Sequence, residues 1–245
     1  MNEILEGNER IDDLEYKGLK IIQNPDMFCF GTDAVILSWF TTLKKWDKVV
    51  DFCTGTGIIP ILLSGKDTAK YITGIEIQPY MAQMALRSVK LNGLDETISI
   101  INGDIMHADD IIKESVDVVT VNPPYEKANS GIEPKEDCHS VARFEKKCTL
   151  FGIIDNAAKI LKPKGRLYMI HRSARLSEVF VILNKAGIEA KRLQFVQSRE
   201  GKAPSHFLVE GVKGASAGII VKPNLIVYKE DGEYTDTLKQ IYHLI

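Results

Sequence analysis

The sequence lacks the features that mark membrane, secreted and metal-binding proteins. No apolar run approaches the ~18 residues needed to cross a bilayer, and the first ten residues are polar and acidic, unlike a signal peptide. The four cysteines form no C-x-x-C pair and no zinc-like pairing with the five histidines. These absences predict a cytoplasmic protein with reduced thiols, no membrane partner and no bound metal.

The sequence also has little excess charge, no internal repeat and no low-complexity linker. It contains 31 Lys and Arg against 33 Asp and Glu, a formal charge of −2, so the chain as a whole is no polycation. The segment 159–213 differs, because it holds 12 basic and 4 acidic residues. Such a block is typical either of a phosphate-facing surface or of an ordinary solvated one, and charge alone favours neither.

Length and composition indicate one globular unit of the α/β class. The 245 residues are 44% apolar and 26% charged, which excludes extended disorder, collagen and coiled coil. Predicted strands alternate with helices up to about residue 190, so we expect a mostly parallel sheet with helices on both faces. Two strands then follow each other directly, which predicts an antiparallel strand at the edge of the sheet.

Apolar periodicity and turn residues place the individual elements. A hairpin over 11–23 and the first helix form a small N-terminal extension, residues 1–45, packed on a main domain of residues 46–245. The predicted strands of the sheet are Trp46–Asp51, Tyr71–Ile77, Thr97–Ile101, Val116–Val121, Arg166–His171, Ala190–Val196 and His206–Gly211. The predicted helices are Asp33–Phe40, Gly57–Ser64, Pro79–Leu91, Phe144–Leu161, Ser173–Ala186 and 235–243.

A glycine turn follows the first predicted strand of the sheet. In the segment from Asp51 to Gly57, glycines let the backbone turn sharply and approach a ligand closely. Similar turns bind dinucleotides, but Pro60 occupies the position of the third glycine, and Asp51 would repel a pyrophosphate. An acid at this place suits a cation, so Asp51, Thr54, Gly55 and Gly57 are predicted ligand contacts.

Two further acids follow the second and third strands. Glu76 lies where a carboxylate can accept both ribose hydroxyls of a nucleoside, and Asp104 could accept a hydrogen bond from an adenine amine. Each also has a plain structural interpretation, as an exposed strand end for Glu76 and a turn aspartate for Asp104. Together with Asp51 they describe a pocket for a positively charged nucleoside without phosphate, which is S-adenosylmethionine. Ile77 and Ile105, next to the two acids, complete the predicted pocket.

The tetrapeptide Asn122-Pro123-Pro124-Tyr125 directly follows the fourth strand. An amine on adenine is a poor nucleophile because its lone pair is delocalised into the ring. The Asn122 side-chain oxygen and the Pro123 carbonyl can each accept one amine hydrogen, which aims the lone pair at a methyl group. The prolines stiffen the turn, and Tyr125 offers an aromatic face to a base swung out of its stack. The alternative is a proline-terminated strand followed by a tyrosine in a turn.

The order of these motifs resembles the class I methyltransferase family, and the tetrapeptide resembles members that methylate planar, conjugated nitrogens. Flanking segments are similar to the bacterial valine-tRNA adenine-37 N6-methyltransferase family. They are Phe30-Gly31-Thr32-Asp33-Ala34, which lines the cofactor pocket in that family, Ala142-Arg143-Phe144-Glu145, and the late segments from Arg199 to Pro204 and from Leu225 to Tyr228. Phe144 departs from the family's Ala-Arg-His-Glu, which leaves the histidine's role without a counterpart.

The resemblance implies a Rossmann-like class I fold with a seven-stranded sheet, S-adenosylmethionine as cofactor, and Phe30, Thr32 and Asp33 as further cofactor contacts. The implied reaction is methyl transfer to the N6 amine of an RNA adenine, specifically adenine 37 of a valine tRNA. The basic stretch then predicts a tRNA track on the enzyme, with no obligate protein partner. Its members are Arg143, Arg172, Arg175, Arg199 and Lys202.

Other activities remain open from the motifs alone. The tetrapeptide is shared with adenine and guanine methyltransferases of ribosomal RNA and with glutamine-N5 methyltransferases of release factors. The latter usually carry a separate helical N-terminal domain, for which about 45 residues before the first strand are too few. A non-catalytic RNA-binding scaffold would not be expected to keep the acids and the tetrapeptide. Pro60 and Asp51 weigh against a nucleotide-dependent oxidoreductase.

Overall fold

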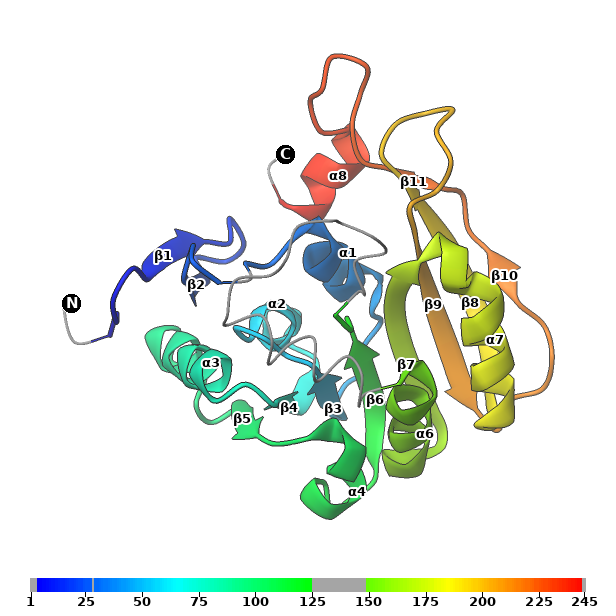
Figure 1. The fold of residues 1–245 in the computed structure, drawn as a ribbon, viewed down its shortest axis with the longest axis horizontal. Helices are drawn as coiled ribbons and strands as arrows, with labels where there is room; N and C mark the ends of the chain where they lie inside the picture. Colours follow the sequence, from blue (N-terminus) through cyan, green and yellow to red (C-terminus); the bar gives the residue numbers. More distant parts are fainter. Residues whose placement is uncertain (1–3, 28, 125–148, 244–245) are drawn as a thin grey trace.

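A computed structural model describes residues 4–27, 29–124 and 149–243 of the chain (Figure 1). An antiparallel hairpin of β1 (Arg10–Asp13) and β2 (Lys20–Gln23) comes first, as predicted. The turn between them uses Lys17 and Gly18, both with positive φ, which glycine adopts at little cost. Within the described ranges no helix is long and apolar enough to span a bilayer.

Five strands form the parallel part of the main sheet, and each covers most of a predicted strand. Right-handed helical crossovers are the common way to join parallel neighbours, and they explain the alternation seen in the sequence. The order of these five strands is β5-β4-β3-β6-β7, so β3, the first of them in the chain, lies at their centre. The strands are β3 (Asp47–Phe52), β4 (Ala69–Glu76), β5 (Ile98–Asn102), β6 (Val116–Val121) and β7 (Leu161–Arg172).

The antiparallel strand lies inside the sheet, and its prediction as an edge strand is wrong. β9 (His206–Lys213) pairs antiparallel with both β7 and β8 (Ile188–Gln197). After β7 the chain crosses to β8, which does not pair with β7 and leaves one position between them. The next strand, β9, turns back and fills that position. Two short strands, β10 (Ile220–Val221) and β11 (Leu225–Ile226), pair parallel with the outer side of β8. Consecutive strands in a sequence do not reveal which of them is outermost.

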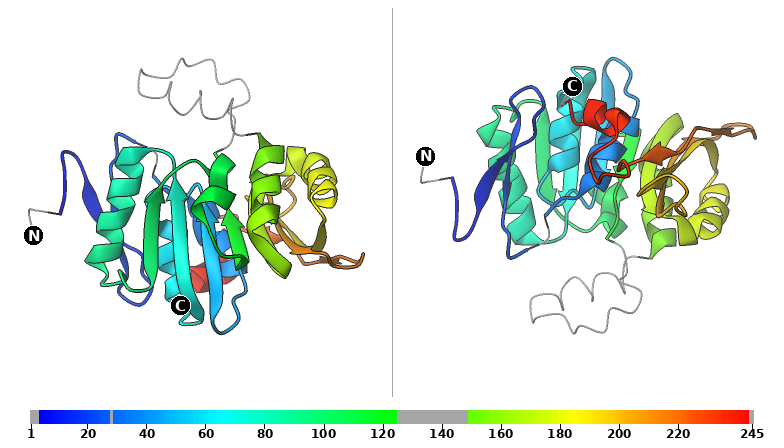
Figure 2. Two further views of the ribbon diagram at one scale, coloured as in Figure 1. Left: turned by 90° about the horizontal axis from the view of Figure 1, so that it is seen from below. Right: turned by 90° about the horizontal axis from the view of Figure 1, so that it is seen from above.

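Helices cover both faces of the sheet, as predicted (Figures 1 and 2). Successive side chains of a strand point to opposite faces, so Val49 and Val50 belong to two different hydrophobic clusters. The helices on the Val49 face are α1 (Thr32–Phe40), α2 (Ile58–Ser64), α3 (Pro79–Leu91) and α8 (Asp236–Ile241). Those on the Val50 face are α4 (Ala108–Ile111), α6 (Leu150–Ile160) and α7 (Leu176–Lys185).

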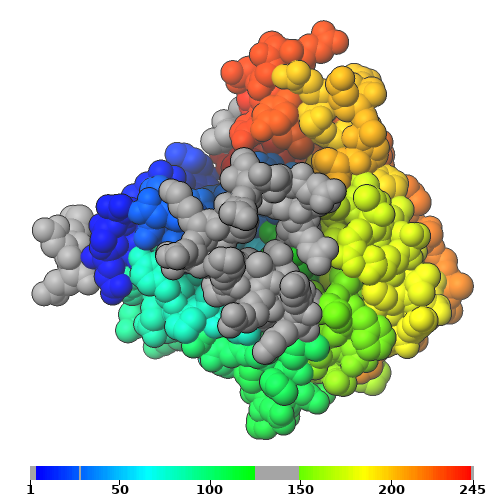
Figure 3. Space-filling view, in the orientation of Figure 1, coloured from blue at the N-terminus to red at the C-terminus, as the bar shows by residue number. Residues whose placement is uncertain are grey.

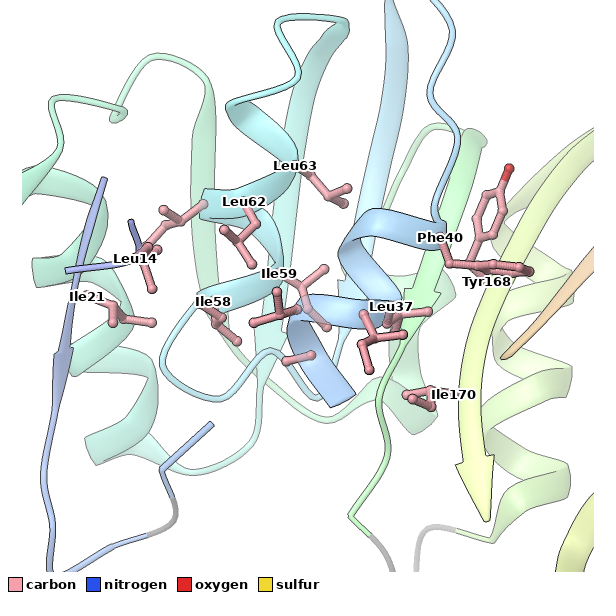
Figure 4. Packing of buried hydrophobic residues seen from close by; sticks show 14 of the residues in the cluster. Leu14, Ile21, Leu37, Phe40, Ile58, Ile59, Leu62, Leu63, Tyr168 and Ile170 are labelled. Atoms are coloured by element: carbon pink, nitrogen blue, oxygen red, sulfur yellow. The ribbon is translucent and has the colours of Figure 1, made fainter. Parts of the chain in front are cut away.

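The N-terminal segment shares its core with the sheet. Leu14, Ile21 and Leu37 are buried in the same cluster as Ile59 of α2 and Tyr168 of β7 (Figure 4). Fully burying one such aliphatic side chain stabilises the fold by about 1.5–3 kcal/mol. Helix α1 is therefore anchored from several sides, which matters because its first turn reaches the candidate site.

One predicted boundary is displaced. The helix predicted over Phe144–Leu161 starts later than expected: α6 begins at Leu150, where the Thr149 side chain accepts a hydrogen bond from the Gly152 N–H at 3.1 Å, and it ends at Ile160. Residues 144–148 lie outside the described residues. Pro163, Lys164 and Gly165, between the predicted helix and the predicted strand Arg166–His171, lie within β7, where the pairing with β6 shifts register and Lys164 takes a positive φ of 64°. An irregular strand start and a helix stop use the same residue types, so the sequence pattern does not separate them.

Candidate active site

The predicted site residues gather at one edge of the sheet. Parallel strands end on the same side, and the segments that follow β3, β4, β5 and β6 carry the glycine turn, Glu76, Asp104 and Asn122. Ligands of open α/β sheets bind at this edge. A narrow cavity opens there, with about 50 Å³ enclosed. Its lining residues are Phe30, Ala34, Cys53, Thr54, Gly55, Thr56, Ile58, Ile59, Met81 and Asn122.

The lining agrees only partly with the prediction. Phe30, Thr54, Gly55 and Asn122 were predicted and line the cavity. Sequence reasoning missed Ala34, Cys53, Thr56, Ile58, Ile59 and Met81. Cys53 and Thr56 belong to the glycine turn, and Met81 lies on the apolar side of the predicted helix 79–91. The sequence therefore contained enough information to include these three residues. Ala34 belongs to the segment that the family resemblance placed at the pocket, whereas Ile59 had no local signal, because its exposure to a cavity depends on how helices pack.

The glycine turn requires its glycines. Gly55 and Gly57 adopt φ values of 56° and 86°, in the left-handed region that side chains disfavour. A Cβ at Gly57 would lie 3.3 Å from the Cβ of Ala85 on α3. The turn therefore packs its backbone directly against α3, and the side chains of Thr54 and Thr56 are buried.

Glu76 holds this turn in place. Its side chain is 4% exposed and accepts hydrogen bonds from the backbone N–H of Gly55 and of Gln78, each at 2.9 Å. Burial raises the pKa of Glu76, and the backbone hydrogen bonds oppose that rise. The Ile77 backbone and the Gln78 side chain also hydrogen-bond to this carboxylate and lower its pKa. The exposed strand end considered from sequence does not occur.

Asp51 is buried beneath the turn and does not line the cavity. It is 0% exposed, and the Thr120 hydroxyl donates to its Oδ1 at 2.6 Å. Its Oδ2 is buried without a hydrogen-bond partner among the described residues. Burial, aided by the negative charge of Glu76, raises the pKa of Asp51 to about 7. A nearby cation would stabilise the ionised form of this carboxylate.

Asp104 adopts the structural role that the sequence left open. Its Oδ1 accepts a hydrogen bond from the Met106 N–H at 2.9 Å and so caps a short 3₁₀ helix, Ile105–His107. Ile105 is buried in the core on the Val50 face, which is a correction to its predicted place in the pocket. Asn102 donates to the carbonyls of Glu76 and Ile77 at 2.8 and 3.1 Å, which ties the ends of β4 and β5 together.

Asn122 follows β6 and meets the first turn of α1. Its Nδ2 donates to Oδ2 of Asp33 at 3.2 Å. Pro123 is buried and Pro124 is exposed. Tyr125 and Arg143, both predicted site residues, lie outside the described residues. Thr32 and Asp33 do not line the cavity, although α1 carries Ala34 into its wall.

The remaining basic residues of the predicted RNA track lie at the same edge of the sheet. Arg172 ends β7 opposite His206, and Arg199 and Lys202 are exposed in the hairpin between β8 and β9. The hairpin lies beside the C-terminal segment, where Tyr228 donates its N–H to the Ser198 carbonyl (Figure 3). Arg175 is paired with Glu178, which offsets its charge.

Comparisons with known proteins identify the family. The model of the methyltransferase small domain matches residues 18–186, more than half of the chain. The chain belongs to this family. The methyltransferase is 27% identical over 234 residues to a tRNA1(Val) (adenine(37)-N6)-methyltransferase of Porphyromonas gingivalis, covering 91% of each chain. A protein of the same name from Haemophilus influenzae is 23% identical, with 92% of this chain and 94% of the relative covered.

Solved structures agree with the fold. A protein described as a predicted O-methyltransferase from Agrobacterium tumefaciens superposes with a TM-score of 0.69 at 18% identity. The match covers 86% of the methyltransferase and 95% of that chain. The predicted class I methyltransferase fold is thus confirmed. The short strands β10 and β11 bring the sheet to nine strands in the described residues instead of the expected seven, and the antiparallel β9 lies inside it.

Family and fold make S-adenosylmethionine the methyl donor of this methyltransferase. The residues at the site fit it. Oδ2 of Asp51 is an unsatisfied buried acceptor near the glycine turn, and Glu76 is a second buried carboxylate bonded to that turn. The enclosed 50 Å³ holds only part of a nucleoside, so the rest has to lie toward the open edge of the sheet. In the described part of the chain, no three metal-ligating side chains come together.

Proposed function

We propose that this protein transfers a methyl group from S-adenosylmethionine to the N6 amine of an adenine in tRNA, adenine 37 of a valine tRNA. The observation that carries the proposal is the position of Asn122, at the end of β6 and in the wall of the cavity. The names of the relatives, which align with over 90% of the chain, support the same substrate. A tRNA substrate would also place the protein in the cytoplasm.

Asn122 and Pro123 would orient the amine. Its two hydrogens are donated to the Asn122 Oδ1 and the Pro123 carbonyl oxygen, which leaves the nitrogen lone pair directed at the donor. As the new bond forms, positive charge develops on the amine, and both oxygens stabilise it electrostatically. S-adenosylmethionine supplies an electrophilic methyl group when bound. The amine then loses one proton to solvent.

The cofactor would be held by the turn and the acids below it. Phe30, Thr54 and Gly55 supply walls, Glu76 accepts the ribose hydroxyls, and Asp51 offsets the positive charge. In this proposal Asp104 and Ile105 shape this edge and do not contact the cofactor. Asp104 caps a 3₁₀ helix, and Ile105 is buried in the core. Ile77 and Thr32 stay as proposed contacts.

The RNA would reach the site across the hairpin. Arg172, Arg199 and Lys202 offer positive charge at the carboxyl edge of the sheet, where a phosphate backbone can pass. Arg175 contributes less, since Glu178 pairs with it. In this proposal residues 46–245 form the methyltransferase domain and residues 1–45 are an extension packed on it, as the shared core supports.

The decisive test is methyl transfer from labelled S-adenosylmethionine to total tRNA from a strain that lacks this protein. Nucleoside digestion should recover the label as N6-methyladenosine, and mapping should locate it at position 37 of valine tRNA. Asn122→Ala should abolish transfer while its cofactor affinity by calorimetry stays unchanged. Label in ribosomal RNA or in protein glutamine instead would refute the tRNA assignment. An Asn122→Ala variant with near-normal turnover would refute the orienting role.

A further inference from the structure

We infer that Asp33 is the positioning residue that sets the orientation of the Asn122 amide. Nothing in the sequence motifs assigns this role, because Asp33 was expected to contact the cofactor. The two residues are 89 positions apart and meet where the first turn of α1 faces the end of β6. Asp33 does not belong to the cavity wall, whereas Asn122 does. The inference rests on the proposed role of Asn122 as an acceptor.

The chemistry of the contact determines which way the amide faces. A side-chain amide has one donor end and one acceptor end, and rotation by half a turn exchanges them. An ionised carboxylate accepts hydrogen bonds and donates none, so only the NH₂ end of Asn122 can face Asp33. The observed bond, Nδ2 to Oδ2 at 3.2 Å, has this sense. Oδ1 therefore points away from Asp33, in the orientation that the proposed acceptor role requires.

The carboxylate of Asp33 is itself held in place from two sides. Its Oδ1 accepts a hydrogen bond from the Ala34 N–H at 3.0 Å, at the N-terminus of α1, where a negative charge is stabilised. Gly31 precedes it, and a Cβ at that position would lie 2.8 Å from Asp33 Oδ1. Gly31 has an ordinary extended backbone, with φ −107° and ψ 177°. A side chain at Gly31 would therefore displace the Asp33 carboxylate, while the backbone conformation of Gly31 is open to any residue.

This geometry separates positioning from cofactor binding. Removing the carboxylate removes the contact that excludes the reversed amide, so orientations that present a donor to the amine become populated. The loss of a hydrogen bond to a charged group lowers kcat by about 10- to 100-fold. The Kd for S-adenosylmethionine and the KM for RNA should stay unchanged, because Asp33 does not line the cavity.

The test compares Asp33→Ala, Asp33→Asn and Gly31→Ala with a control, Asp109→Asn. Asp109 is an exposed acid in the first turn of α4, away from the site, so its replacement removes a similar charge from a helix start. Asp33→Ala and Gly31→Ala should lower kcat alone, and Asp33→Asn should restore part of it, since asparagine can still accept. A weaker Kd for the cofactor with unchanged kcat would overturn the inference.

A second measurement needs neither RNA nor cofactor. The side-chain ¹⁵N–¹H₂ signals of Asn122, identified by their absence in Asn122→Ala, should shift and exchange faster with solvent in Asp33→Ala and Gly31→Ala. The Asp109→Asn spectrum should keep them in place. Signals that do not move would refute the contact itself. Failure of tRNA methylation by the wild-type protein would instead refute the proposed function, so the two failures are distinguishable.

Discussion

Replacing Asp51 with asparagine should remove a pH dependence of cofactor binding. Burial raises the pKa of this carboxyl to about 7, so it titrates in the range where the enzyme would work. A cationic cofactor favours the ionised form and should bind more tightly as the pH rises through 7. With a pKa near 7 the carboxyl is about one-tenth ionised at pH 6 and about three-quarters ionised at pH 7.5. We therefore expect the Kd for S-adenosylmethionine to be about eightfold higher at pH 6 than at pH 7.5.

The measurement is calorimetry at both pH values with wild type, Asp51→Asn and Thr120→Val. Asp51→Asn should bind the cofactor weakly at both pH values. Any titration of the cofactor itself affects both proteins equally, so it cancels in the ratio of the variant's Kd to that of wild type. Thr120 donates to Oδ1 of Asp51 and lowers its pKa, so Thr120→Val should move the dependence to higher pH. Equal pH dependence in wild type and Asp51→Asn would refute the electrostatic role of Asp51.

The same carboxyl should affect the stability of the free protein in the opposite sense. Folding raises the pKa above the ordinary value of 3.8, so the folded state holds its proton more tightly. Its contribution to stability is present below pH 3.8 and is lost as the pH rises to about 7. Asp51→Asn should therefore melt at a higher temperature than wild type at pH 8. A lower melting temperature there would show that the buried charge is compensated.

Three other perturbations test the site. Glu76→Gln loses one acceptor for the N–H groups of the turn and should weaken cofactor binding about 10- to 100-fold by calorimetry, whereas an unchanged Kd would exclude the ribose role. Gly57→Ala forces a side chain into the left-handed region and against Ala85, so denaturant titration should show a loss of about 1–2 kcal/mol. Reversing Arg199 and Lys202 to glutamate should raise the KM for RNA and reduce its salt dependence, with cofactor affinity intact. An unaltered salt slope would remove both residues from the RNA path.

Local patterns in the sequence determined most of the elements. The helix Pro79–Leu91 and the strand Val116–Val121 were predicted with the bounds that the structure has, since proline, Asn-Gly and Pro-Pro delimit them. The glycine turn and Glu76 were predictable for a related reason. Both lie where a buried strand ends, and the alternation of strands and helices implies that such ends share one edge.

Only the tertiary structure decided which residues meet. The place of β9 inside the sheet, the cap made by Asp104, and the contribution of Ala34 and Ile59 to the cavity depend on how distant elements pack. The bond from Asn122 to Asp33 joins two motifs that each look complete in the sequence. Periodicity and turn chemistry act over a few residues and so specify elements. A contact between residues far apart in the chain is specified by the geometry of the folded core, which no single segment contains.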